Sequence, residues 1–147
     1  MSLIVFLVLV AAAAWTGSRY KPGAWYEQLQ KPAWTPPNWL FPIAWSVLYL
    51  MMAISGWLVW GAGGWTAALL FWALQLVFNA AWSWLFFGRR LIHVALADIV
   101  LLWLAIMAFI MLSWPVSQAA ALLFLPYLLW VSFAGLLNWR ITRMNDT

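Results

Sequence analysis

The sequence predicts an all-α membrane protein, a bundle of five transmembrane helices with a structured loop between the first and second helices. Only 7% of the residues are charged, 68% are apolar and the mean hydropathy is +0.94, which excludes a soluble globular domain with a charged surface. No charged residue occurs between Lys31 and Arg89 or between Asp98 and Arg140. Each of these stretches can hold two spans of about 20 residues. We therefore expect residues 1–147 to form a single membrane domain.

The first predicted helix covers residues 2–18, which are uncharged and largely apolar. The stretch lacks the basic start of a cleaved signal peptide, so we interpret it as a span, although an uncleaved anchor has nearly the same pattern. The loop over residues 19–37 follows. Pro36 and Pro37 fix their own φ angles and favour extended structure in the residues before them, so this loop should have a defined shape.

The other four predicted helices cover residues 39–60, 65–87, 91–114 and 118–139. In the first of these, Pro42 lies near the start, where a missing backbone N–H costs least, and the glycine-rich residues 61–64 end the helix. The helix over residues 65–87 ends at Gly88 and two arginines, and the helix over residues 91–114 ends at Pro115. The helix over residues 118–139 ends before a basic tail.

The basic residues support a count of five spans. With five spans, every Lys and Arg falls on one side of the membrane, whereas four or six spans would scatter them over both sides. The residues are Arg19, Lys21, Lys31, Arg89, Arg90, Arg140 and Arg143. The positive-inside rule then places the N-terminus outside, and the loop and tail on the cytoplasmic side of an inner membrane. This topology accounts for the net charge of +4 without any nucleic-acid partner.

Few residues are suited to catalysis or metal binding. The chain has no cysteine and a single histidine, His93, so we expect no thiolate chemistry and no metal site. Asp98 is the one acid in a predicted span. It has either a structural role, protonated or paired with Arg89 or Arg90, or a role in proton or substrate handling. Without a nucleophile and base pair in the spans, hydrolytic catalysis has no support.

Three predicted helices each present aromatic and polar side chains on one face. These faces are formed by Trp45, Tyr49 and Met52, by Gln75, Asn79 and Trp82, and by Tyr127, Trp130, Ala134 and Asn138. Such faces suit a large, flat, mostly apolar ligand, with Ala134 leaving room for it. In the alternative interpretation, Gln75 and Asn79 hydrogen-bond to neighbouring helices. Both interpretations remain open at this point.

An ordered set of motifs resembles one known family over nearly the whole chain. The set comprises Trp25-Tyr26, Lys31-Pro32, residues 34–39, Phe41-Pro42, Trp45, Tyr49, Phe78-Asn79, Trp82, residues 86–88, residues 126–130, Phe133-Ala134 and Leu137-Asn138. It resembles the TspO/MBR family of tryptophan-rich sensory proteins and mitochondrial translocator proteins.

The resemblance implies a five-helix membrane receptor or carrier, commonly a homodimer, that binds porphyrins such as protoporphyrin IX. Sensing or transport of tetrapyrroles is the implied function, with no obligatory cofactor beyond the porphyrin ligand. One alternative is light- and oxygen-dependent porphyrin degradation, with Trp45 and Trp130 as electron donors. Another is transport of a different apolar ligand, such as a sterol. Some relatives occupy outer membranes, so that location also stays open.

The resemblance also implies which residues contact the ligand and the second subunit. The family's pocket positions carry over to Tyr26, Trp34, Pro36, Trp45, Tyr49, Asn79, Trp82, Trp130 and Ala134, and the helix faces described above add Gln75 and Tyr127. A small-residue stripe with Ala73 and Val77 on the third helix is similar to the family's dimer contact. The sterol motif of animal relatives is incomplete, because Trp139 replaces its tyrosine between Leu137 and Arg140. This change argues against sterol binding.

Overall fold

The computed structural model describes residues 1–145, and the regular structure in this range is helical. The elements are α1 (Leu3–Arg19), α2 (Ala24–Glu27), α3 (Leu40–Gly63), α4 (Ala67–Ser83), the π-helix η1 (Trp84–Gly88), α5 (Ile92–Ser113), α6 (Gln118–Leu123) and α7 (Leu125–Met144). Four helical stretches are long and apolar enough to cross a membrane, namely α3, α4 with η1, α5, and α6 with α7. The helix α1 is apolar but shorter. The prediction of an all-helical membrane bundle is confirmed.

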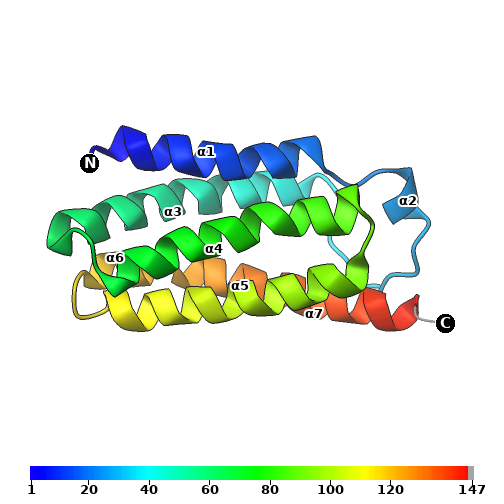
Figure 1. Ribbon diagram of the computed structural model, residues 1–147. Coiled ribbons are helices and arrows are strands. Elements are labelled where there is room, and N and C mark those ends of the chain that lie inside the picture. Colours follow the sequence, from blue (N-terminus) through cyan, green and yellow to red (C-terminus); the bar gives the residue numbers. More distant parts are fainter. Residues whose placement is uncertain (146–147) are drawn as a thin grey trace.

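The long helices lie side by side, and the short helix α2 and its loop lie at one end of the bundle (Figure 1). The first helix, α1, packs against α3 and α4, while α5 packs between α4 and α7. The helix α3 also contacts α6. The end of α1, the turn from η1 to α5 and the end of α7 lie at the same end as α2 (Figure 1). All seven basic residues therefore gather at one end of the bundle, as the five-span count predicts.

The end of α3 lies beyond the predicted boundary, and the last turn of the third span has a form that was not predicted. The helix α3 runs through Gly61 to Gly63, and the residue that caps it, Gly64, has a φ of 65°. Glycine adopts this left-handed conformation without a steric penalty, so it can terminate the helix there. The third span changes to a π-helix at Trp84, where the backbone N–H of Arg89 donates to the carbonyl of Trp84 at 2.7 Å. This wider turn changes the direction of the side chains that follow.

The last span is divided rather than continuous. It is interrupted at Phe124, between α6 and α7. The cause is Pro126, which has no N–H to donate and lies in the first turn of α7, where its fixed φ is tolerated. The predicted helix over residues 118–139 is thus formed by α6 and α7 together, and α7 ends at Met144, beyond the predicted end.

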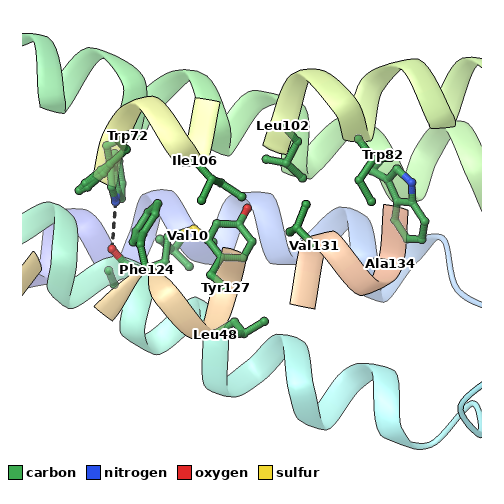
Figure 2. Close-up of a cluster of buried hydrophobic side chains, with 14 of the residues drawn as sticks. Val10, Leu48, Trp72, Trp82, Leu102, Ile106, Phe124, Tyr127, Val131 and Ala134 are labelled. Atoms are coloured by element: carbon green, nitrogen blue, oxygen red, sulfur yellow. Dashed lines mark hydrogen bonds between the residues drawn. The ribbon is translucent and has the colours of Figure 1, made fainter. Parts of the chain in front are cut away.

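A cluster of buried side chains fills the middle of the bundle (Figure 2). Tyr127 lies near the centre of the view, and Trp72 donates its indole N–H to the carbonyl of Met52 at 2.9 Å. Gly56 makes this bond possible, because a Cβ at that position would lie 2.5 Å from the Trp72 ring. The bundle is thus well packed at its centre, and the cavity described below lies nearer its end.

Candidate ligand-binding cavity

A cavity of about 620 Å³ lies at the basic end of the bundle, beside the loop that precedes α3. Its volume falls within the range of roughly 300–1,000 Å³ that is usual for small-molecule sites. The lining residues come from the end of α1, the loop, the start of α3 and the end of the third span. They are Ala14, Gly17, Ser18, Tyr20, Lys21, Pro22, Asn38, Trp39, Phe41, Pro42, Trp45, Ser46, Tyr49, Trp82, Ser83 and Phe87.

Flat aromatic rings form much of the cavity wall. Trp45 and Tyr49 lie one helical turn apart on α3, and their rings stack at 5.6 Å with an interplanar angle of 27°. From the third span, Trp82 and Phe87 contribute two further rings. The π-helix directs Phe87 to the cavity, whereas the adjacent Phe86 is buried. Such a wall favours a planar, mostly apolar ligand.

A chain of hydrogen bonds links the cavity wall to the bundle core. Tyr49 donates its hydroxyl hydrogen to Oδ1 of Asn79 at 2.9 Å, and Asn79 donates through Nδ2 to the Tyr127 hydroxyl at 2.8 Å. Tyr127 in turn donates to Oε1 of Gln75 at 2.8 Å. Gln75 and Asn79 therefore bond to neighbouring helices, as the second interpretation of their pattern proposed. Tyr49 is the one member of this chain that reaches the cavity.

A second set of hydrogen bonds fixes the edge of Trp82. Its indole N–H donates to Oδ1 of Asn138 at 3.0 Å, and Asn138 donates to the carbonyl of Ile92 at 3.1 Å. Because the polar edge is already bonded to α7, the indole presents apolar surface to the cavity. Asn138 thus positions a cavity residue without lining the cavity itself.

The structure brings together only some of the predicted ligand-binding residues. Trp45, Tyr49 and Trp82 line the large cavity. Tyr26 and Ala134 line a neighbouring void of about 10 Å³, which Trp82 also contacts. The ligand contacts proposed for these five residues remain predictions.

The other predicted residues lie outside the large cavity. Trp34 packs edge-on against Phe133 with centroids 5.5 Å apart, and Pro36 lines an open groove on the loop. Gln75, Asn79, Tyr127 and Trp130 line none of the three cavities described. Trp130 nevertheless contacts the wall, because its ring lies edge-on to that of Trp45 at 6.2 Å.

Sequence analysis missed the contribution of α1 to the cavity. Ala14, Gly17 and Ser18 line it from one face of this helix. The signal was present in the sequence, since three small residues at positions i, i+3 and i+4 share a face and leave space beside it.

The basic residues of the loop have different surroundings. Lys31 donates through Nζ to the carbonyl of Tyr26 at 2.8 Å and lies 4.6 Å from the Tyr26 ring centroid, so it holds α2 in place. Lys21 lines the cavity and is exposed, and it has no hydrogen-bond or ion-pair partner within residues 1–145. Lys21 is therefore a cation that the cavity lining offers to a ligand.

Tyr26 is buried beneath the loop, and its hydroxyl has no hydrogen-bond partner among the described residues. Burial, together with the nearby charge of Glu27, raises the pKa of Tyr26 to about 12. The residue is thus held in its neutral form over the physiological pH range.

The structure corrects one interpretation of Asp98. Its side chain is buried in α5, and Oδ2 has no hydrogen-bond partner among residues 1–145. The predicted pairing with Arg89 or Arg90 does not occur, because these guanidinium groups lie over the rings of Trp84 and Trp25, each at 5.7 Å. The arginines lie at the bundle end, where aromatic rings are closer partners than a side chain within the span.

The remaining predicted residues are on the outside of the bundle or near the small void. Leu137 is buried against that void, whereas Trp139 is exposed and Arg140 lies over its ring at 5.7 Å. The residues of the sterol-like motif therefore do not form one surface. Ala73 and Val77 are exposed on the outer face of α4.

Comparison with known proteins gives consistent matches over nearly the whole chain. Residues 3–144 match the sequence model of the TspO/MBR family. The chain is 43% identical to protein CrtK of Rhodobacter capsulatus, with 96% of this chain and 91% of the relative covered. It is 39% identical to a tryptophan-rich sensory protein of Cereibacter sphaeroides, with 97% and 90% covered. It is 37% identical to the human translocator protein, with 95% and 88% covered.

Proposed function

Because the chain belongs to the TspO/MBR family, we propose that it is a membrane receptor or carrier that binds a porphyrin-like tetrapyrrole in the 620 Å³ cavity. The names of its relatives, tryptophan-rich sensory protein and translocator protein, are consistent with sensing or transport. The observation that carries the proposal is the cavity wall. Trp45, Tyr49 and Trp82 present aromatic surface there, and Lys21 supplies a positive charge at the loop end.

Each part of the wall has a distinct task in this proposal. The rings of Trp45 and Trp82 stack on the macrocycle, and Lys21 attracts a carboxylate at its edge. Asn79 acts through Tyr49, because its amide is already bonded to the hydroxyls of Tyr49 and Tyr127. Asn79 is thus a positioning residue in this mechanism.

The direct test is a titration with protoporphyrin IX, followed by the absorbance of the porphyrin so that loss of a tryptophan does not disturb the signal. We expect saturable binding, and a severalfold weaker affinity for Trp45→Ala. Trp65→Ala is the matched control, because Trp65 is 80% exposed and lines none of the three cavities. Absence of saturable binding by protein with intact helical circular dichroism would refute the proposal.

A second candidate function is porphyrin degradation in light and oxygen. It is favoured by the contact of Trp45, which lines the cavity, with Trp130 at 6.2 Å. In this reading Trp45 gives an electron to a photoexcited porphyrin, and oxygen takes that electron from the porphyrin anion to form superoxide. Trp45 and Trp130 share the electron vacancy until it is refilled from the porphyrin ring, and superoxide then adds to the oxidised ring. Product that still forms in the dark or without oxygen would exclude this function. Product formed at the same rate by Trp45→Phe would indicate simple photosensitisation.

We also propose that the protein forms a homodimer through the outer face of α4. Val77 is 64% exposed and Ala73 is close to it on the same helix, so both are available to lipid or to a second copy. Small side chains allow such helices to approach closely. Ala73→Trp should shift the protein to the monomer in light-scattering measurements of the detergent complex, and an unchanged mass would count against this interface.

A further inference from the structure

The contact between α1 and α3 is tight at one end and loose at the other. Away from the loop, Phe6 and Val10 of α1 are buried, and these large side chains fill the space between the helices. Towards the loop, α1 lines the cavity with small residues, the half-buried Ala14 and Gly17 and the exposed Ser18. A Cβ at Gly17 would lie 3.8 Å from Oγ of Ser83 and 3.9 Å from the Tyr49 hydroxyl. This face therefore lines the cavity without filling it.

On the other side of the gap, residues of α3 both line the cavity and face outward. Pro42 and Ser46 line it and are exposed, and Trp39 lines it with 64% of its surface exposed. A residue can contact both the cavity and the exterior only at the rim of an opening. The Ser46 hydroxyl donates to the Pro42 carbonyl at 2.6 Å, so it has no hydrogen free for a ligand. On its α3 side the rim is thus largely apolar.

The surface around this rim is also apolar. Trp15 of α1 and Ile43 of α3 are 60% and 55% exposed. Such residues on a spanning helix face lipid or the membrane interface. The opening is therefore flanked by surface suited to the bilayer rather than to water.

The loop, by contrast, is held closed. The backbone N–H of Gln30 donates to Oδ1 of Asn145 at 3.0 Å, and Asn145 donates through Nδ2 to the Gln30 carbonyl at 2.9 Å. Asn38 at the cavity donates to Glu27, and Lys31 binds the carbonyl of Tyr26. Entry of a ligand through the loop would break several of these bonds, whereas entry between α1 and α3 breaks none of them.

We propose that the cavity opens sideways into the membrane leaflet between the ends of α1 and α3, and that its ligand is an anionic amphiphile that enters from the bilayer and places its anionic group at Lys21. This inference rests on the proposed function and specifies how the ligand reaches the site and what charge it carries. Lys21 can reach the interface because a long lysine side chain keeps its charge in the polar headgroup region.

The rates of binding test the route. In phosphatidylcholine proteoliposomes, Ser46→Phe narrows the rim and should slow both association and dissociation of protoporphyrin IX about fivefold. The two rates should change more than the dissociation constant, which is their ratio. Trp39→Ala widens the rim and should accelerate both rates. Val47→Phe and Trp65→Ala are matched controls that line none of the three cavities. Unchanged rates for Ser46→Phe, with faster rates for Asn145→Ala, would show that the ligand enters through the loop and overturn the proposal.

The charge at Lys21 is tested with a matched pair of ligands. Lys21→Gln should weaken binding of protoporphyrin IX about tenfold and leave binding of its dimethyl ester unchanged, because the ester has no carboxylate. An equal loss of affinity for both ligands would show that Lys21 affects the shape of the cavity or the folding of the protein. This result would contradict the proposed contact between Lys21 and an anionic group.

A measurement without porphyrin separates the opening from the proposed function. The chain has no cysteine, so Gly17→Cys can carry a single bimane label at the cavity. We expect lipids brominated near the headgroup to quench this label in proteoliposomes, as they quench a label at the exposed Val47→Cys. Quenching at Val47→Cys alone would show that the cavity is closed to lipid, whether or not the protein binds porphyrin.

Discussion

The hydroxyl of Tyr49 donates to Oδ1 of Asn79 at 2.9 Å and so joins the wall of the cavity to the hydrogen-bonded core of the bundle. The other end of the Asn79 amide is bonded to Tyr127. One side chain thus fixes two tyrosines on two different helices, α3 and α7. The orientation of the Tyr49 ring in the cavity depends on a residue that the ligand does not need to touch.

The first prediction follows from this link. Asn79→Leu removes a partner from both tyrosine hydroxyls, and we expect it to destabilise the protein by about 1–2 kcal/mol, within the range for hydrogen bonds between membrane helices. Thermal unfolding in detergent measures this loss. The double variant Asn79→Leu with Tyr49→Phe should lose less than the sum of the two single variants, because they share one bond. Strict additivity would mean that the bond contributes nothing.

The sequence predicted the inward helix faces better than it predicted the cavity. Gln75, Asn79 and Trp82 are all buried, because helical periodicity determines which side chains share a face. Periodicity does not determine whether a buried polar group binds a ligand or a neighbouring helix, and here Gln75 and Asn79 bind helices. That choice depends on how the helices pack.

Two local features could not be read from periodicity. The π-helix at Trp84–Gly88 changes which rings of the third span reach the cavity. The position of the cavity depends on the small side chains Ala14, Gly17 and Ser18 of α1; their spacing shows that they share a face, but it does not show that the space beside them stays open. By contrast, the charge distribution predicted the basic end of the bundle correctly, since it depends only on the number of spans.

The second prediction concerns two glycines of the same helix. Gly56→Ala should destabilise the protein by roughly 1–3 kcal/mol, because the new Cβ would lie 2.5 Å from the Trp72 ring and would force that buried side chain to move. Gly61→Ala is the matched control, since nothing lies within 4 Å of its Cβ and alanine favours helix. Chemical denaturation in mixed micelles compares the two variants. Equal stabilities of Gly56→Ala and Gly61→Ala would show that α3 and α4 can move apart at Trp72 at little cost in free energy.

The third prediction is a loss of stability at alkaline pH that depends on Tyr26. Burial favours the neutral phenol and raises the pKa of Tyr26 in the folded protein to about 12, from an ordinary value of 10.0. The stabilising effect is therefore complete below pH 10 and is lost as the pH rises through the folded pKa. From pH 9 to pH 11 the wild type should lose about 1 kcal/mol more than Tyr26→Phe, which has no group that titrates.

The comparison with Tyr26→Phe cancels the lysines and the other tyrosines, which titrate in both proteins. At pH 7 we expect Tyr26→Phe to be as stable as the wild type or slightly more so, because it removes a buried hydroxyl that has no partner. Parallel stability curves from pH 9 to pH 11 would show that Tyr26 is open to water in the folded protein.

The fourth prediction concerns the attachment of the loop to the end of α7. Asn145 accepts from the backbone N–H of Gln30 at 3.0 Å, and it donates to the carbonyls of Gln30 at 2.9 Å and Ile141 at 2.7 Å. Asn145→Ala removes all three bonds, so we expect the amide hydrogen of Gln30 to exchange at least tenfold faster. Because these bonds are largely exposed, the global stability should fall by less than about 1 kcal/mol.

Gln30→Ala is the control, since only backbone atoms of Gln30 take part in these bonds. The amide hydrogen at position 30 should exchange at the wild-type rate in this variant. Faster exchange in Gln30→Ala alone would mean that the glutamine side chain, rather than Asn145, holds the loop against α7.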